Sequence, residues 1–255
     1  MSVETERLGR VLVITIRREH KRNAIDASVT AGLDAALNNL EDDPELWCGV
    51  LTGGPQVFSA GADLAAGAGD RTPRGGIAGI IQRHRTKPLI AAVEGYAIGG
   101  GMEMVLCCDL VVAARTALFG LPEVKRGLMP DFGGAFRVAR MLPANVAREL
   151  LLTGDSLPAE RAERLGFVNL VTDQGAALAA AIELANRVTG NAPLAVREAL
   201  AIVNAEIGGN EDPSWLRSDA AHARLLASED LREGIEAFFA RRAPRWQARL
   251  QCPRT

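Results

Sequence analysis

The sequence has few cysteines, no long apolar run and no large excess of either charge. Its 4 cysteines include no CxxC pair, so we expect reduced thiols packed inside a cytoplasmic protein. No apolar stretch approaches the roughly 18 residues that span a bilayer, and the N-terminus lacks the apolar core of a signal peptide. The net charge of −2 offers no general attraction to polyanions, so neither membranes nor nucleic acids are expected partners. The cysteines are Cys48, Cys107, Cys108 and Cys252.

Motifs typical of nucleotide-binding proteins and hydrolases are also missing. There is no Gly-Lys-Ser or Gly-Lys-Thr phosphate loop, and the glycines at 53–54 and 99–101 do not fit GxGxxG. Ser59, in "FSAGAD", is not part of a G-x-S-x-G turn. The 3 histidines lack metal-ligand spacing and are expected at the surface, so no metal site is predicted. They are His20, His84 and His222.

The pattern of apolar residues predicts an α/β fold. Runs such as "VLVITI" (11–16) are β-branched and short, as in buried strands, and several end in glycine turns. Helical spacing of apolar residues over 27–41, after Asp26 as a predicted N-cap, indicates an amphipathic helix. Strand, glycine turn and helix then recur. The other strands are predicted within 47–54, within 88–101 and from about Leu110, with a helix over 102–114 that gives way to this last strand.

The character of the chain changes after about residue 173. The segments 174–188, 192–206 and 218–242 are helical in composition and period, and Gly208, Gly209 and Pro213 separate them. We therefore expect an α/β core over 1–190 and a helical region over 191–255. The helical region is too small to bury a good core alone, so it must pack on the core or on another subunit.

Two glycine turns are the strongest candidates for a binding site. "AIGGGMEM" (97–104) has three glycines at the start of a helix, where backbone N–H groups and the helix dipole stabilise negative charge. "AGAD" (60–63) is a second turn of small residues with amides that could be exposed. Amides converging from both turns would form an oxyanion hole. The alternative is that these glycines only permit close packing.

Three carboxylates follow these turns or lie between prolines and glycines. Glu103 lies in the first turn of the helix that the glycines open, in apolar company. Glu123 follows Pro122, and Asp131 lies between Pro130 and a Phe-Gly-Gly turn. Each has a structural alternative, since acids stabilise helix N-termini and aspartate favours turns.

Taken together, four motifs resemble the enoyl-CoA hydratase/isomerase (crotonase) family. "NAI" (23–25), "FSAGADL" (58–64), "AIGGGMEM" (97–104) and "FGLPEVKRGLMPDFGGAFR" (119–137) occur in the family's order and spacing, and the resemblance covers essentially the whole chain. It implies a crotonase-like spiral of ββα units with a C-terminal helical region. It also implies assembly into homotrimers or dimers of trimers.

The resemblance further implies an acyl-CoA site. The amides of Ala62 and Gly100 would hold the thioester oxygen, Glu103 would activate water, and Glu123 would deliver a proton to Cα. CoA is carried by the substrate, so no separate cofactor is expected. Arg241 and Arg242 resemble basic residues that reach the CoA phosphates. The positions that match the family's CoA contacts are Arg22, Ala24, Ala60, Asp63 and Leu64.

Two departures from common hydratases leave the reaction open. Met102 stands where many hydratases have a small residue, and it could trim the acyl pocket. Asp131 replaces a common glycine and could be an auxiliary acid, which brings the site closer to isomerases or carnitinyl-CoA-like dehydratases. The first prediction is an enoyl-CoA hydratase that adds water syn to a 2-enoyl-CoA and forms 3-hydroxyacyl-CoA. The alternatives are an isomerase or carnitinyl-CoA-like dehydratase of this fold, and a non-catalytic acyl-CoA-binding protein, which would not need both glutamates.

Overall fold

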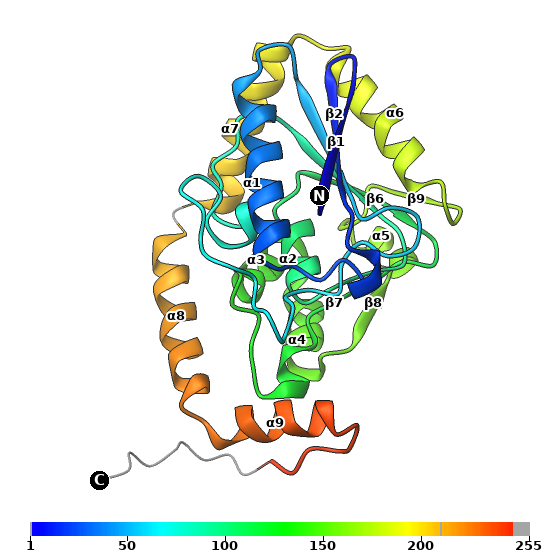
Figure 1. The fold of residues 1–255 in the computed structure, drawn as a ribbon. Coiled ribbons are helices and arrows are strands. Elements are labelled where there is room, and N and C mark those ends of the chain that lie inside the picture. Colours follow the sequence, from blue (N-terminus) through cyan, green and yellow to red (C-terminus); the bar gives the residue numbers. More distant parts are fainter. Residues whose placement is uncertain (1, 210, 247–255) are drawn as a thin grey trace.

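A computed structural model describes residues 2–209 and 211–246, and Figure 1 labels its elements. The strands are β1 (Val3–Leu8), β2 (Val11–Ile16), β3 (Cys48–Thr52), β4 (Leu89–Val93), β5 (Tyr96–Ile98), β6 (Leu110–Ala114), β7 (Leu118–Gly120), β8 (Ser156–Pro158) and β9 (Leu170–Thr172). The helices are α1 (Ala27–Asp42), α2 (Gly100–Val105), α3 (Gly134–Met141), α4 (Ala144–Thr153), α5 (Ala159–Arg164), α6 (Ala177–Thr189), α7 (Pro193–Gly208), α8 (Asp212–Leu226) and α9 (Glu229–Phe239). Short 3₁₀ helices are η1 (Glu19–Lys21), η2 (Ile77–Gly79) and η3 (Pro122–Arg126).

Two sheets organise the chain. The larger sheet has the order β1-β2-β3-β4-β6-β9, in which β1 is antiparallel to β2 and every other neighbouring pair is parallel. The smaller sheet has the order β5-β7-β8. Because β2, β3 and β4 are parallel, their carboxyl ends meet at one edge, and the segments that follow them gather there. The predicted α/β class is confirmed.

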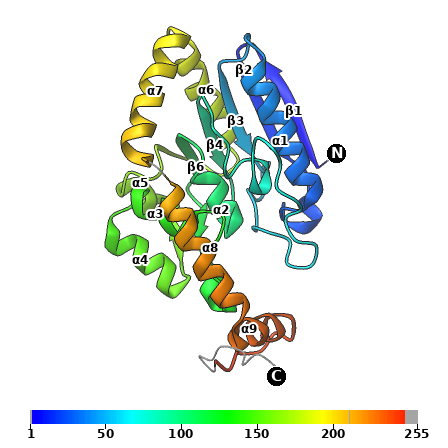
Figure 2. The same ribbon diagram turned by 90° about the vertical axis from the view of Figure 1, so that its left-hand side faces the viewer.

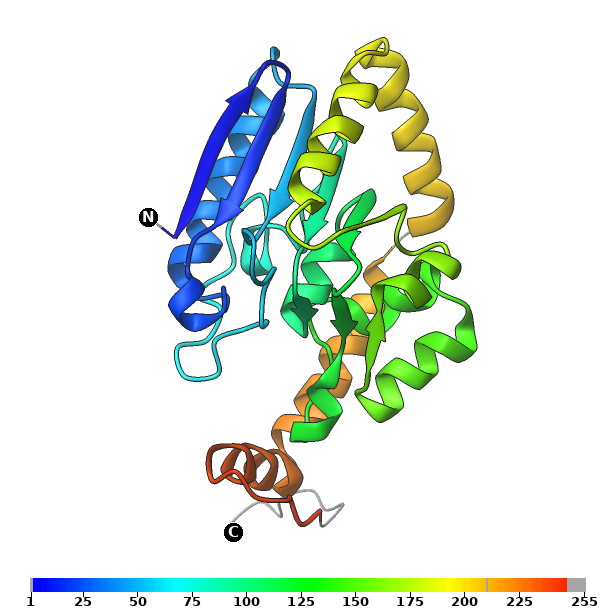
Figure 3. The same cartoon turned by 90° about the vertical axis from the view of Figure 1, so that its right-hand side faces the viewer.

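The central strands of the larger sheet are buried on both faces, and their apolar residues alternate between two cores. On β2, Leu12 and Ile14 pack in the cluster that contains α1, whereas Val11 and Val13 pack in the cluster that contains α6. Figure 3 shows α6 lying across the sheet. Helix α6 can approach the strands closely because the residues it buries are small. These residues are Ala177, Ala181 and Ala185.

Helix α1 is fixed at both ends. The Asp26 carboxylate accepts hydrogen bonds from the amides of Ser28 and Val29, both at 3.0 Å, which confirms the predicted N-cap. At the other end Lys87 is buried, and its Nζ donates to the carbonyl oxygens of Leu40 and Asp43. A cation at this end complements the helix dipole, so the burial of Lys87 has a structural explanation.

The chain leaves the core after α6. Figure 2 shows α7 and α8 following one another along one side of the molecule, with α9 at the lower end. None of the residues of α7, all of which are described, is buried. Helix α9 packs against η3, and the backbones approach so closely that a methyl group at Gly234 would lie 2.4 Å from the Arg126 carbonyl oxygen. Among the described residues, no helix is long and apolar enough to span a membrane.

Most of the predicted elements are present, with three differences. The N-terminal segment forms an additional edge strand, β1. Most of its side chains are polar and exposed, so it lacks the apolar pattern that predicts a strand. The predicted 88–101 segment is two strands, β4 and β5, which belong to different sheets. The helical segment 218–242 is divided, because Ser228 accepts a hydrogen bond from the Leu231 amide and so caps a new helix, α9. Cys252 lies outside the described residues.

Candidate functional site

The site begins where the segments after β2 and β3 pair with each other. The Ile25 amide donates to the Gly61 carbonyl at 2.8 Å, and the Asp63 amide donates to the Ile25 carbonyl at 2.9 Å. The Ala60 amide also donates to the Arg22 carbonyl at 3.0 Å. The structure thus brings together the predicted CoA-contacting positions Arg22, Ala24, Ala60, Asp63 and Leu64. Their contact with CoA stays a prediction.

Asn23 and Ser59 hold this arrangement from inside, and the sequence analysis did not assign them a role. The buried Asn23 amide group donates to the carbonyls of Gly53 at 2.7 Å and Val57 at 2.9 Å. Ser59 Oγ donates to the Asn23 carbonyl and accepts from the Gly61 amide. Asn23 also has φ +53°, a left-handed conformation that asparagine tolerates better than most residues. This preference was the available sequence signal for Asn23.

Asp63 has a structural partner. Its carboxylate forms an ion pair with Arg18 Nη2 at 2.8 Å and accepts hydrogen bonds from the amides of Ala65 and Ala66. The hydrogen bond from Arg18 and these two amides lower the pKa of Asp63. Arg18 also reaches Asp26, so it ties the start of α1 to the "AGAD" turn.

The two glycine turns lie against each other. A methyl group at Gly61 would lie 2.8 Å from the Ile98 carbonyl oxygen and 3.0 Å from the Gly100 nitrogen, so only glycine allows this approach. Within the residues that the structure describes, the amides of Ala62 and Gly100 have no hydrogen-bond acceptor. Gly100 is the first residue of α2, where amides lack partners within the helix. The two amides therefore belong to turns that contact each other, and their role as donors to a thioester oxygen stays a prediction.

Glu103 is a buried carboxylic acid at the start of α2. It is 2% exposed, and its Oε1 accepts a hydrogen bond from the Gly134 amide at 2.7 Å, at the start of α3. Burial raises the pKa of Glu103 well above its usual value, and the neighbouring Glu123 raises it further. The Gly134 amide opposes this shift because it stabilises the carboxylate. Met102, next to Glu103, is fully buried in the main core.

Glu123 approaches the same helix from η3. A methyl group at Gly99 would lie 2.9 Å from Glu123 Oε1, so this carboxyl group faces the first turn of α2. Its Oε2 is enclosed and has no hydrogen-bond partner among the described residues. Burial raises the pKa of Glu123 to about 7, and the charge of Asp131 contributes. Carboxyl groups with raised pKa values are typical of functional sites, and the proton-transfer roles of Glu103 and Glu123 stay a prediction.

Asp131 is the third acid of the site. Its pKa is raised by burial, while His222 and Arg71 oppose the shift. Its Oδ2 lies 3.4 Å from His222 Nδ1 of α8. His222, which was expected at the surface, is 30% exposed and lies on α8 beside Asp131. Sequence spacing had no signal for this contact.

The tail arginines are exposed. Arg242 forms a salt bridge with Glu233, and its Nη2 lies 2.9 Å from Glu233 Oε2. Arg241 adopts a left-handed conformation, with φ +52°. Contact of either residue with CoA phosphates stays a prediction. Within residues 2–209 and 211–246, no group of three or more His, Cys, Asp or Glu side chains is placed to hold a metal ion.

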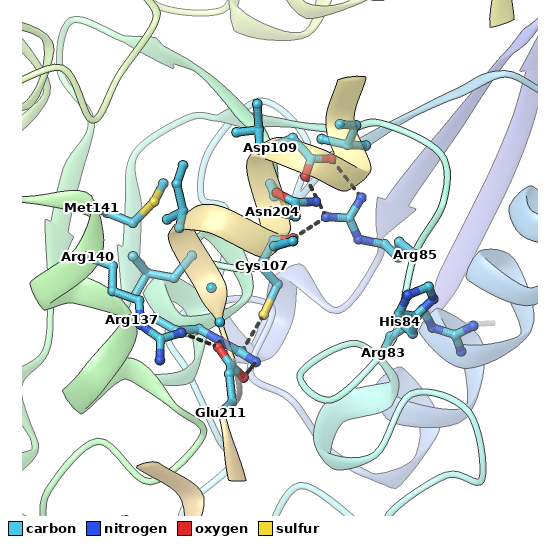
Figure 4. Close-up of a pocket in the computed structure, with 18 of the residues that line it drawn as sticks. Arg83, His84, Arg85, Cys107, Asp109, Arg137, Arg140, Met141, Asn204 and Glu211 are labelled. Atoms are coloured by element: carbon cyan, nitrogen blue, oxygen red, sulfur yellow. Dashed lines mark hydrogen bonds and ion pairs between the residues drawn. The ribbon is translucent and has the colours of Figure 1, made fainter. Parts of the chain in front are cut away.

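A cavity of about 560 Å³ lies between α7 and the core, and its lining includes none of the predicted site residues. Figure 4 shows Arg137 and Arg140 reaching Glu211, and Arg85 reaching Asp109, at its wall. Arg137 belongs to α3, whose first amide binds Glu103. Glu211 directly precedes α8. The ion pairs of Glu211 with Arg137 and Arg140 therefore connect the beginning of α8 to α3, the helix whose first amide binds Glu103.

Comparison with known proteins identifies the family. A family model described as "Enoyl-CoA hydratase/isomerase" matches residues 6–249. The chain belongs to the enoyl-CoA hydratase/isomerase family. A carnitinyl-CoA dehydratase of Salmonella typhi is 41% identical over 97% of this chain and 99% of the relative.

Solved structures agree. A carnitinyl-CoA hydratase from Mycobacterium avium is 42% identical and superposes with a TM-score of 0.92, over 97% of this chain and 99% of that one. An enoyl-CoA hydratase from Mycobacterium tuberculosis is 45% identical with a TM-score of 0.79 over the same shares. The crotonase-like fold expected from the resemblance is confirmed.

The approach of the two turns predicts unequal effects at two glycines of one loop. Gly61→Ala and Gly67→Ala both place alanine at positive φ, which costs about 1–2 kcal/mol. A methyl group at Gly67 meets nothing within 4 Å, whereas at Gly61 it collides with backbone atoms of the other turn. We expect a clearly larger loss of unfolding free energy for Gly61→Ala in urea denaturation. Equal losses would show that the turns do not need this contact.

The raised pKa of Glu123 predicts a pH-dependent cost of folding. The folded protein keeps a proton that the unfolded chain releases between pH 4.5 and about 7, so this group destabilises the fold increasingly as pH rises through that range. Glu123→Gln should therefore gain unfolding free energy relative to wild type between pH 5 and pH 8, by about 1–3 kcal/mol.

Glu149→Gln is the control for this measurement, since Glu149 is exposed and Arg161 lowers its pKa. Urea denaturation at both pH values gives the comparison. A gain in Glu123→Gln that is independent of pH would contradict the assignment.

Proposed function

We propose that this protein catalyses the reversible addition of water to a 2-enoyl-CoA thioester, as a hydro-lyase. The observation that carries the proposal is the pair of enclosed carboxyl groups, Glu103 and Glu123, beside two turns with unpaired amides. Membership of the enoyl-CoA hydratase/isomerase family supports an acyl-CoA substrate. A protein that only binds acyl-CoA would not need two buried acids.

In this proposal the amides of Ala62 and Gly100 bind the thioester oxygen. Addition at Cβ places negative charge on that oxygen, and fixed donors stabilise the charge without reorganising. The positive end of α2 adds to the effect at Gly100. CoA lies along the paired turns, against Arg22, Ala24, Ala60, Asp63 and Leu64.

Proton transfer is divided between the two glutamates. Ionised Glu103 takes a proton from water as the oxygen bonds to Cβ, and protonated Glu123 donates to Cα on the same face. Because the charge of Glu123 raises the pKa of Glu103, ionising both groups is unfavourable, and one proton on the pair would supply both forms. Dehydration of a 3-hydroxyacyl-CoA uses the same groups in reverse.

Carnitinyl-CoA is the substrate to test first in the dehydration direction. It is a 3-hydroxyacyl thioester whose acyl group ends in a quaternary ammonium, and two similar proteins are named for reactions on it. Asp131 supports this choice, because a third carboxylate beside the pair favours a cationic acyl group. The same assay with a 3-enoyl-CoA tests double-bond isomerisation as the reaction, whereas Met102 and Asp131 stay predicted determinants of the acyl pocket.

We also propose a homo-oligomer, a trimer or a dimer of trimers, in the cytoplasm. Helix α7 supports this, since Leu194 is 72% exposed, Ile202 64% and Ile207 52%. Several large exposed apolar side chains on one helix are typical of a surface that another subunit covers. The helical region 191–255 would then both join subunits and close the CoA site.

Glu103→Gln and Glu123→Gln should each lower kcat by about 10²–10⁴-fold with little change in KM, because amides cannot exchange the protons. The ultraviolet absorbance of the conjugated enoyl thioester measures the reaction, with crotonyl-CoA for hydration and carnitinyl-CoA for dehydration. Glu149→Gln, an exposed glutamate paired with Arg161, is the control and should keep wild-type rates.

Two outcomes would reject the hydro-lyase proposal. One is a wild-type enzyme that binds CoA thioesters but changes neither substrate. The other is migration of the double bond in a 3-enoyl-CoA without uptake of water.

Wild-type protein should have a mass of about three or six times 27.1 kDa in size-exclusion chromatography with light scattering. Ile202→Glu on α7 should reduce that mass, because a charge in an apolar interface is unfavourable. Leu152→Glu, at a 77% exposed position on α4, is the matched control and should leave the mass unchanged. A wild-type mass of 27.1 kDa would contradict the proposed assembly.

A further inference from the structure

Glu103 is connected to α3 at two points. The Gly134 amide, the first of α3, donates to its carboxyl group at 2.7 Å, and a methyl group at Gly134 would lie 2.7 Å from Glu103 Oε1 and displace it. At the second point, the Cys107 thiol donates to the Glu103 carbonyl at 3.2 Å, and Arg137 Nη1 donates to Cys107 Sγ at 3.0 Å. Both the carboxyl group and the backbone of Glu103 are therefore linked to the same helix.

The Arg137 guanidinium uses all three of its nitrogens in this arrangement. Nε and Nη2 donate to the two carboxylate oxygens of Glu211, at 3.1 and 2.7 Å, and Nη1 donates to Cys107 (Figure 4). The side chain is 14% exposed and lies beside the rings of Phe136 and Trp215, 5.6 Å from each centroid. A planar guanidinium that is paired on two sides is fixed in direction, which the point charge of a lysine cannot reproduce.

Arg140 provides the comparison within the same helix. Its Nη1 donates to Glu211 Oε1 at 2.8 Å, so both arginines of α3 hold the residue that precedes α8. Among the described residues, Arg140 makes no hydrogen bond to α2 or to the turn that follows it, whereas Arg137 reaches Cys107. The attachment of α8 is therefore common to both arginines, and the connection to Glu103 belongs to Arg137.

We propose that Arg137 is a positioning residue of the site: it joins Cys107 to α3 and thereby keeps the Gly134 amide on the carboxyl group of Glu103. Its effect on rate rests on the proposed function, because that effect requires Glu103 to take part in proton transfer. Its effect on the Gly134 amide does not, and can be measured without any substrate. The two effects are therefore tested separately.

The first measurement is hydrogen exchange of the segment 132–137 in the full chain, by mass spectrometry and without substrate. Arg137→Lys keeps the charge but cannot hold Glu211 and Cys107 together, so the Gly134 amide in this segment should exchange about tenfold faster. Arg140→Lys is the matched control, the same change on the same helix, and should leave the exchange as in wild type. Unchanged exchange in Arg137→Lys, or the same increase in both variants, would overturn the proposal, whatever the reaction proves to be.

The second measurement separates kcat from KM in the enoyl thioester assay. Arg137→Lys should lower kcat by about 10–10²-fold with little change in KM, because a displaced carboxyl group transfers protons poorly but does not bind CoA. Arg140→Lys should keep the wild-type kcat. Equal values of kcat in the two variants would overturn the proposal. A wild-type protein without activity would instead reject the hydro-lyase proposal, and the hydrogen exchange would still decide the role of Arg137.

Two variants at Cys107 test the connection from its other end and leave Arg137 in place. Cys107→Ser keeps a group that both donates and accepts a hydrogen bond, whereas Cys107→Ala removes it. Cys107→Ala should therefore lower kcat as Arg137→Lys does, and Cys107→Ser should keep most of the wild-type kcat. In the Arg137→Lys background, Cys107→Ala should have no additional effect. Effects that add in the double variant would show that Arg137 does not act through Cys107, and would overturn the proposal.

Discussion

The arrangement of this protein depends on enclosing carboxyl groups inside an apolar structure. An unpaired buried carboxylate is strongly unfavourable, so each acid needs a donor, a proton or a counter-ion. Glu103 has the Gly134 amide, which links α2 to α3, while Glu123 has a pKa of about 7 and so retains a proton near neutrality. Asp131 has His222. Each of these contacts involves a different element of the fold, and together they determine which helices meet at the site.

The site also depends on glycines, which have no side chain. At Gly61 and Gly101 even a methyl group would strike backbone atoms of the neighbouring turn. The two turns therefore touch through their backbones rather than through side chains. The buried Asn23 side chain supports these turns through three hydrogen bonds: it accepts one from the Arg18 amide and donates to the carbonyls of Gly53 and Val57. In the proposed reaction, amides held in place by backbone contacts would be rigid donors, as stabilisation of a developing charge requires.

The C-terminal helices serve the site unequally. Helix α9 packs on the element that carries Glu123, and α8 lies along the segment that carries Asp131. Helix α7 has no buried residue and borders a cavity next to the core. The region is therefore neither an independent domain nor a simple extension of the core. Its stability depends on contacts with the site at one end and, in our proposal, with another subunit at the other.

Local patterns in the sequence determined the local structure. Short β-branched apolar runs predicted the buried strands, and Asp26 predicted the start of α1, because these signals arise from neighbours in the chain. The glycine turns and the two glutamates were recognised together only through their resemblance to a family. The tertiary structure decided which turns touch and how one apolar run divides between two sheets. It also decided that His222 lies beside Asp131. These contacts join segments far apart in sequence, whose meeting depends on the packing of whole elements and leaves no periodic trace in the chain.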